Sequence, residues 1–339
     1  MTFSPLHTFA GGTLLSLASS SFLSDIGRVF GISSIVAESF WGDGDSWRLA
    51  TTAGLIFGPT LGKVFGLPGA YASEPLSGWF SIPWTRASLA GLLVGFGSRL
   101  GSGCTSGHFL CGVSRGSPRS LVATATFFLS AVLTANLVPM ETPYPSWIPK
   151  PNPFTIQTGL AYAPLITVPI LAGLVFTLRS TLARSGSNPP RIIRLAPYFL
   201  AGLTFSFGLL ISGMADPRKV LHFLTPFSPR FDPSLAMIVL GGVVPNALYW
   251  NYTPKGKVQY PWEEWRIPTR TDIDRRLMAG SMIFGIGWGL AGVCPGPAIV
   301  GIGKIVQGII SGEDIGGPGA PLLAFILSMI MGMGAGGAV

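Results

Sequence analysis

The most reactive side chains of the sequence gather in one short stretch, GSGCTSGHFLCGVSRG, at residues 101–116. It contains two of the three cysteines, one of the three histidines and five glycines. A thiol is a soft, polarisable group with a weak S–H donor. His108 follows Cys104 by four residues, so on an α-helix its imidazole would share the face of the thiol and could hydrogen-bond the thiol or a ligand. These groups suit an anion contact, a metal site or a reactive thiol.

The spacing within this stretch does not favour a metal site or a disulfide. Tetrahedral zinc needs four ligands at matched spacings, whereas Cys104, His108 and Cys111 supply three and no fourth is evident. A helical path would separate the two cysteines by about 10 Å along the axis, and a disulfide needs Cα atoms within about 7 Å. We therefore predict no metal and no other cofactor. Packing is the alternative role for the thiols, above all for Cys111, because free cysteine is commonly buried.

A second cysteine occurs in an equivalent setting. The tripeptide GFG precedes Cys104 and GIG precedes Cys294, at the same offset. The SGC that ends in Cys104 recurs as an SGM that contains Gly213 and ends in Met214. Repetition of a long apolar run, a glycine break and a short helical segment indicates internal repeats.

The composition of the chain is typical of a membrane protein. Of its 339 residues, 48% are hydrophobic, 46 are glycine and only 11% are charged, whereas soluble domains carry roughly 25% charged residues. Glycine-rich, apolar helices pack closely in bilayers. The net charge of +8 is therefore assigned to loops that follow the positive-inside rule, and no nucleic-acid partner is predicted.

Long runs without Asp, Glu, Lys or Arg mark the expected membrane helices, since a spanning helix needs about 20 apolar residues. Such runs are 1–24, 120–140, 151–178, 195–215, 233–254, 277–303 and 315–339. The shorter runs 49–62 and 87–98 can span with their flanks. The sequence thus predicts an all-α integral membrane protein with about nine transmembrane helices. All of residues 1–339 form a single polytopic domain in this interpretation. The first run lacks a positively charged leader, so we expect it to be a retained helix.

Four segments are helical in pattern but too short to cross a bilayer, namely 26–39, 105–115, 217–224 and 296–308. Asp216 followed by Pro217 is a typical helix start, and Cys294 followed by Pro295 is similar. These segments are predicted to be re-entrant half-helices, with helices in surface loops as the alternative.

The distribution of basic residues predicts the orientation. With nine spans, the arginine-rich linker 179–194 and the loop 255–276 fall on one side, which we assign to the cytoplasm. The N-terminus then lies outside and the C-terminus inside. Two half-helices enter from each side, as in inverted repeats formed here by residues 1–178 and 195–339. Such repeats place the substrate site near the middle of the membrane.

The helix breaks have a chemistry that favours anions. A helix that starts inside the membrane directs free N–H groups and a partial positive charge at the site, and glycine allows close approach of the backbone. Thr105 and Ser106 add hydroxyl donors, and Arg99 and Arg115 flank the stretch and could attract anions. A soft thiol at such a break fits an anion with a sulfur end better than a hard anion such as sulfate or phosphate.

Three segments also resemble the signatures of a known family. They are LGSGCTSGHFLCGVSR at 100–115, FGLLISGMADPRKVLHFL at 207–224 and GWGLAGVCPGPAIV at 287–300. They are similar, almost residue for residue and in the same order, to the motifs of the YeeE/YedE sulfur-transport family, and RVFGISSIVAE at 28–38 resembles its first short element. The resemblance covers residues 8–337 approximately. It implies an hourglass-shaped importer of sulfur-containing ions, with thiosulfate the best-supported substrate.

The resemblance also implies roles for individual residues. Cys104 and Cys294 match the cysteines of the pore constriction in the family, and Gly112 matches its first motif. Some relatives carry a further cysteine in the first re-entrant element, where this chain has Ser33 and Ser34. Some relatives also work with a small cytoplasmic sulfur-carrier protein. The candidate pore residues are Cys104, Cys294, His108, Cys111, Gly103, Thr105, Ser106, Gly107, Ser33, Ser34, Met214, Gly213, Gly292 and Pro295.

The leading hypothesis is a thiosulfate permease of the plasma membrane, in contact with the lipid bilayer, and not an enzyme. The sequence has no Walker A pattern for ATP. One alternative is transport of another sulfur or selenium species or another small anion. A second is a membrane sulfurtransferase that carries a persulfide on Cys104.

Overall fold

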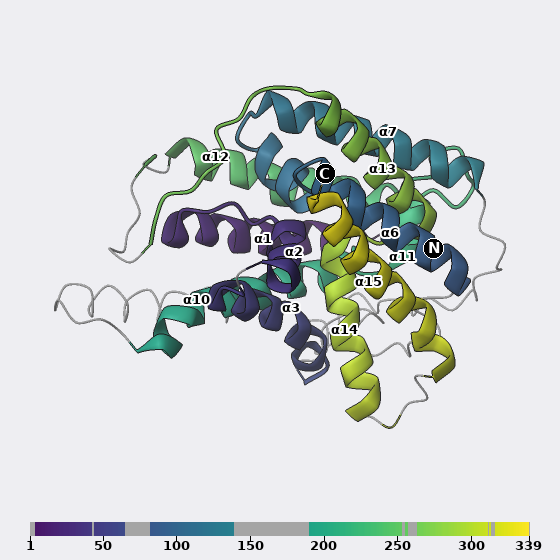
Figure 1. Ribbon diagram of the computed structural model, residues 1–339, viewed down its shortest axis with the longest axis horizontal. Coiled ribbons are helices and arrows are strands. Elements are labelled where there is room, and N and C mark those ends of the chain that lie inside the picture. The colour runs from purple at the N-terminus through teal and green to yellow at the C-terminus, as the bar shows by residue number, and fades with distance from the viewer. Residues whose placement is uncertain are drawn as a thin grey trace.

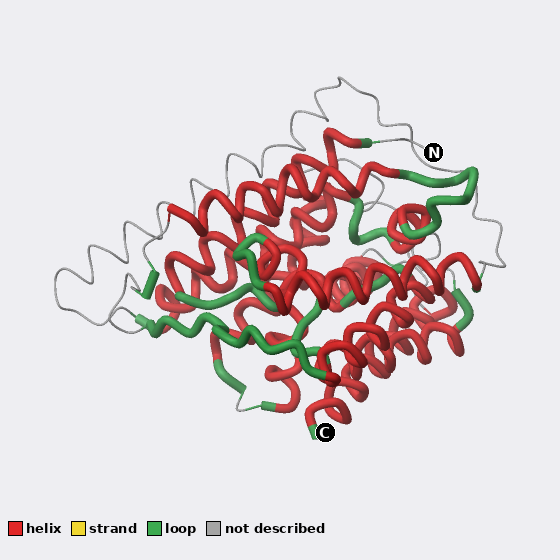
Figure 2. The backbone as a smooth tube through the Cα atoms, turned by 90° about the horizontal axis from the view of Figure 1, so that it is seen from above, coloured by secondary structure: helices red, strands yellow, loops and turns green. Residues whose placement is uncertain are grey.

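A computed structural model describes residues 4–42, 44–64, 82–138, 190–252, 255–256, 263–310, 312 and 316–338. Within these residues the fold is helical and contains no strand, only an isolated bridge between Arg28 and Arg266 (Figure 2). The helices of the first half are α1 (Pro5–Ser21), α2 (Ile32–Trp41), α3 (Ser46–Val64), α6 (Trp84–Leu100) and α7 (Pro118–Leu137). Those of the second half are α10 (Arg191–Ser212), α11 (Pro217–Phe223), α12 (Val244–Tyr252), α13 (Arg275–Ala291), α14 (Pro295–Ile310) and α15 (Gly316–Gly337). Short π-helices are η1 (Phe22–Ile26), η2 (Ser106–Val113) and η4 (Val239–Val243), and η3 (Pro233–Ala236) is a 3₁₀ turn.

The predicted membrane character is confirmed in its main features. Five described helical segments are long and apolar enough to cross a membrane. They are Pro118–Leu137, Arg191–Ser212, Pro233–Tyr252, Arg275–Ile310 and Gly319–Gly337. The predicted runs 1–24, 49–62 and 87–98 form the helices α1, α3 and α6 of 17 to 19 residues. The predicted run 151–178 and most of the linker 179–194 lie outside the described residues.

The helices pack as two bundles that each combine both halves of the chain (Figure 1). In one bundle α6 packs against α13 and α15, and α7 packs against α13. In the other, α10 packs against α1 and α3, while η4 and α12 pack against α1. Helix α14 lies along α3. The two halves are therefore interleaved and do not form separate lobes.

Glycine permits the close helix crossings of both bundles. A Cβ atom on Gly95 would lie 2.0 Å from the carbonyl oxygen of Met329 in α15. A Cβ atom on Gly202 would lie 2.1 Å from the carbonyl oxygen of Thr51 in α3. Backbone contact of this kind is a usual basis of helix association in lipid, because burial of apolar surface between helices is not a driving force there.

Each short helix follows a break in the chain. Helices α10 and α13 end at Gly213 and Gly292, whose φ angles are 78° and 70°, in the left-handed conformation common at helix C-termini. Asp216 then caps α11 by accepting from the Arg218 N–H, with proline in the first turn, as predicted. The four short segments of the sequence correspond to α2, η2, α11 and α14. Helix α14 has 16 residues, somewhat more than expected.

Candidate functional site

One cavity, of about 20 Å³, lies where the helix breaks of both halves meet. It is bordered by the residues just before η2, by the start of α14, by the start of α2 and by the residue that follows the α10 break. Its polar and break residues are Cys104, Thr105, Ser106, Met214, Cys294, Gly296 and Pro297. The remaining wall consists of Leu15, Ile32, Phe109, Leu110, Phe205, Leu209 and Ile238. The fold thus brings together two thiols that are far apart in the sequence.

Hydrogen bonds connect these thiols to the surrounding breaks. The Thr105 hydroxyl donates to the Cys294 sulfur at 3.4 Å. The Cys104 sulfur lies 3.4 Å from the Ser106 oxygen, which accepts from the N–H of Ile32 at 3.1 Å. Both thiols are almost completely buried, and all three cysteines are free. The hydroxyls of the motif therefore link η2 to α2 and α14.

The cavity has an almost entirely apolar wall, and three helices begin beside it. The first turns of α2, η2 and α14 begin beside it, so their partial positive charge favours an anion. A water molecule needs roughly 10–15 Å³ of such volume, so the cavity is closed to an ion as large as thiosulfate in this conformation. Apolar constrictions of this type block the passage of ions until they widen.

His108 does not line this cavity and has a supporting position. Its Nε2 lies 3.1 Å from the Gly101 carbonyl oxygen, and its Nδ1 lies 3.1 Å from the Ser120 hydroxyl. A carbonyl only accepts, so Nε2 carries the proton and the neutral ring accepts from Ser120 at Nδ1. A Cβ atom on Gly103 would lie 2.7 Å from this ring. Gly103 thus leaves the space in which His108 connects the loop before Cys104 to α7.

We expect His108→Ala to destabilise the protein by about 2–4 kcal/mol, because it would leave two buried groups without their partner. Thermal unfolding of the purified protein would measure this loss. A matched control is Phe109→Leu, a change at the next residue that retains apolar bulk. An unfolding temperature for His108→Ala equal to that of the wild type would contradict the supporting role.

Comparison with known proteins matches each half of the chain to a family model. A family described as sulphur transport matches residues 3–133, and a second family, described as one of unknown function, matches residues 192–336. A probable transporter from Xylella fastidiosa strain Temecula1 is 41% identical over 132 residues, which cover 93% of that protein and 39% of this chain. The chain belongs to the sulphur-transport family. A probable transporter from strain 9a5c is 38% identical over 143 residues, or 88% of its length and 42% of this chain.

The other predicted site residues of this sulphur-transport family member lie around the cavity or away from it. Cys111 is buried, with its sulfur 3.9 Å from the Phe30 carbonyl oxygen, and is not among the lining residues. Ser33 and Ser34, in the first turn of α2, line a different, larger cavity. Gly213 and Gly292 form the breaks, and Pro295 is the first residue of α14. Gly107 lies in the first turn of η2, where a Cβ would meet only Gly31 at 3.9 Å.

The expected roles of the flanking arginines change in the folded chain of this family member. Arg99 forms an ion pair with Glu38 at 2.6 Å, and Arg115 donates to the carbonyl oxygens of Cys111 and Pro268. Sequence reasoning missed the apolar wall, including Phe205 and Leu209, because those residues look like any membrane-helix residues. The sequence CPGP at 294–297 was the feature from which the position of Gly296 and Pro297 at the cavity could have been predicted.

Proposed function

We propose that this protein is a permease that conducts thiosulfate through the cavity between Cys104 and Cys294, and that it is not an enzyme. The observation that carries the proposal is that two thiols from separate breaks border one cavity at the starts of three helices. A sulfur-ended dianion can exchange water for S–H and O–H donors there. The thiols must be protonated, because thiolates would repel the ion.

Permeation requires weak contacts and a transient opening. The closed volume of about 20 Å³ requires the apolar wall to move before an ion passes. A tight site would trap the ion, whereas two similar thiols in sequence allow transfer from one to the next. Thr105 and Ser106, already bonded to the two sulfurs, would contact the oxygen atoms of the ion.

The proposed architecture is an hourglass of inverted repeats with nine spans and re-entrant half-helices, and the packing of the described helices supports the repeat. The two repeats are compared by pairing each helix of the first half with a counterpart in the second. The pairs are α1 with α10, α3 with α12, α6 with α13 and α7 with α15. When each helix is replaced by its counterpart, the main helix contacts are reproduced. The contact of α7 with α13 then corresponds to that of α15 with α6. Relatives shorter than half of this chain are consistent with two units joined in one polypeptide. The proposed orientation in the plasma membrane has the N-terminus outside and the C-terminus cytoplasmic.

A sulfurtransferase with a Cys104 persulfide is the second candidate. It requires access of a sulfur donor or acceptor to the thiol, and Cys104 is only 1% exposed. Burial of this degree favours a contact with a small ion over reaction with a partner protein. Intact-mass measurement after exposure to thiosulfate would show an added sulfur atom on Cys104 if the thiol were a carrier. A cytoplasmic sulfur-carrier protein would receive sulfur from thiosulfate released by a permease, or the outer sulfur atom of the Cys104 persulfide in a sulfurtransferase.

Uptake of labelled thiosulfate into proteoliposomes that contain the purified protein tests the proposal. We expect uptake above that of protein-free vesicles, and competition by excess unlabelled thiosulfate. Competition by sulfite, sulfide or a selenium analogue would show how widely the site accepts related species. Folded protein that gives no uptake above background would reject thiosulfate as a sufficient substrate.

A further inference from the structure

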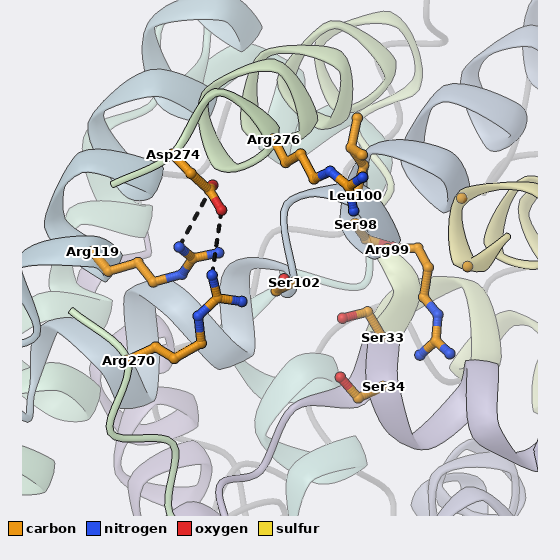
Figure 3. Close-up of a pocket in the computed structure, with 12 residues that line it drawn as sticks. Ser33, Ser34, Ser98, Arg99, Leu100, Ser102, Arg119, Arg270, Asp274 and Arg276 are labelled. Carbon is orange, nitrogen blue, oxygen red and sulfur yellow. Dashed lines mark hydrogen bonds and ion pairs between the residues drawn. The ribbon is translucent and has the colours of Figure 1, made fainter. Parts of the chain in front are cut away.

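A second cavity, of about 350 Å³, lies at the start of α2, where α6 ends and α13 begins (Figure 3). Ser33 and Ser34 border it from α2, Ser98 and Ser102 from the end of α6, and Arg276 from α13. Further arginines reach it from α6, α7 and the segment before α13, and the last glycines of α15 close one side. Its volume is ample for a small ion with water.

Most of the arginines at this cavity already have carboxylate partners. Arg99 pairs with Glu38 at 2.6 Å. Arg119 and Arg270 both pair with Asp274, at 3.6 and 3.4 Å (Figure 3). Both also pair with Asp272. Arg276 differs, since it forms no ion pair with any described residue, and it extends toward the cavity from the start of α13.

Ser33 gives an independent indication of a ligand. Its side chain is 3% exposed and its hydroxyl has no hydrogen-bond partner among the described residues. The hydroxyls of Ser33 and Ser34 are directed into the cavity (Figure 3). A buried hydroxyl without a partner is unfavourable, so its retention on a cavity wall points to an external acceptor. The first-turn amides of α2 lie beside it and have no acceptor within the helix.

Ser102 adds a strained element on the opposite wall. Its φ angle is 60°, which is rare for a residue other than glycine. Strained backbone of this kind is concentrated at functional sites. Here it directs a serine, and not a glycine, to the cavity.

We infer that this serine–arginine cavity is a second anion site, which binds the oxygen atoms of a small doubly charged tetrahedral oxyanion through Arg276, Ser33 and the first turn of α2. Its role as a further binding site for the ion after the thiols rests on the proposed function. Hydroxyl, amide and guanidinium donors are hard and do not distinguish a sulfur end. The site therefore accepts sulfate and thiosulfate alike, and discrimination between them occurs at the thiols.

Calorimetric titration of the purified, detergent-solubilised protein with sulfate and with thiosulfate, at constant ionic strength, tests this inference. We expect saturable binding of both ions. Arg276→Gln is expected to weaken sulfate binding by about tenfold or more, since a hydrogen bond to a charged group is involved. Arg275→Gln is the matched control, because Arg275 and Arg276 are both exposed at the start of α13, but only Arg276 lines the cavity. Equal losses in the two variants, or no loss in either, would overturn the assignment.

Ser33→Ala gives a second readout that a purely structural hydroxyl would not produce. The variant is expected to weaken sulfate binding severalfold and also to raise the unfolding temperature, because it removes the unpaired buried hydroxyl. Unchanged sulfate affinity in this variant would also contradict the inference.

A Cys104→Ala, Cys294→Ala double variant separates this inference from the proposed function. We expect the double variant to retain sulfate binding and to lose thiosulfate uptake. If the wild-type protein binds sulfate in a manner that depends on Arg276 but shows no thiosulfate uptake, the anion site stands and the permease is rejected. Uptake that depends on the thiols, together with no saturable sulfate binding, would support the permease and reject the anion site.

Discussion

Cys104→Ala and Cys294→Ala are each expected to reduce thiosulfate uptake at least ~100-fold, equivalent to about 2.7 kcal/mol on the barrier. Each thiol lies at the wall of the closed cavity. Cys294 accepts from the Thr105 hydroxyl of the opposite break, and Cys104 contacts the Ser106 hydroxyl of its own break. Removal of either leaves one break without a soft donor, so the ion must lose water there without a replacement. Initial rates of labelled uptake into proteoliposomes, normalised to inserted protein, would measure the effect.

Cys111→Ala is the matched control for these variants. Cys111 is a buried cysteine of the same sequence motif, but it does not line the cavity. Its uptake should remain within a few-fold of the wild type. Wild-type rates in both Cys104→Ala and Cys294→Ala would eliminate the thiol path. Cys104→Ser, which retains a donor but not a soft atom, should give an intermediate rate if softness contributes.

Gly292→Ala is expected to destabilise the protein by about 2–5 kcal/mol. Gly292 has a φ of 70°, a conformation unfavourable to any residue with a Cβ by about 1–2 kcal/mol. In addition, a Cβ atom would lie 2.4 Å from the Pro217 carbonyl oxygen of α11, and relief of such overlap costs about 1–3 kcal/mol. The break that positions Cys294 would shift, so uptake should fall together with the unfolding temperature.

Gly116→Ala separates the two contributions. Gly116 has a φ of 66°, and a Cβ atom added to it would have no neighbouring atom within 4 Å. Only the conformational term of about 1–2 kcal/mol should apply there. Thermal unfolding of both variants in the same detergent would compare them. Equal destabilisation of the two would show that contact between the α13 break and α11 contributes nothing.

Several features could be predicted from residues close in the sequence. Charge-free runs predicted membrane helices, and five such segments are found among the described residues. The glycine and proline signals predicted the breaks, as at Asp216 and Pro217, where the cap forms as expected. These predictions succeed because helix length, capping and hydrophobicity depend on chain neighbours. The count of nine spans and the membrane orientation stay predictions.

The expected contact of His108 illustrates a local prediction that the fold changed. A four-residue spacing places two side chains on one face only when the backbone is α-helical. Cys104 instead lies in the break before the helical segment Ser106–Val113, and the His108 ring is held by Ser120 and Gly101. The imidazole therefore supports the loop before Cys104 and does not contact the sulfur.

By itself the sequence determined that this is a helical membrane protein with thiols and glycines at matched breaks, and its motifs indicated the family. Only the tertiary structure decided that Cys104 and Cys294 border one cavity, that Cys111 does not, and that Ser33 lies at a second cavity. The physical reason is that each cavity is enclosed by side chains from several helices of both halves. Their meeting depends on glycine-mediated packing between helices distant in the sequence, and no local pattern encodes which helices approach one another.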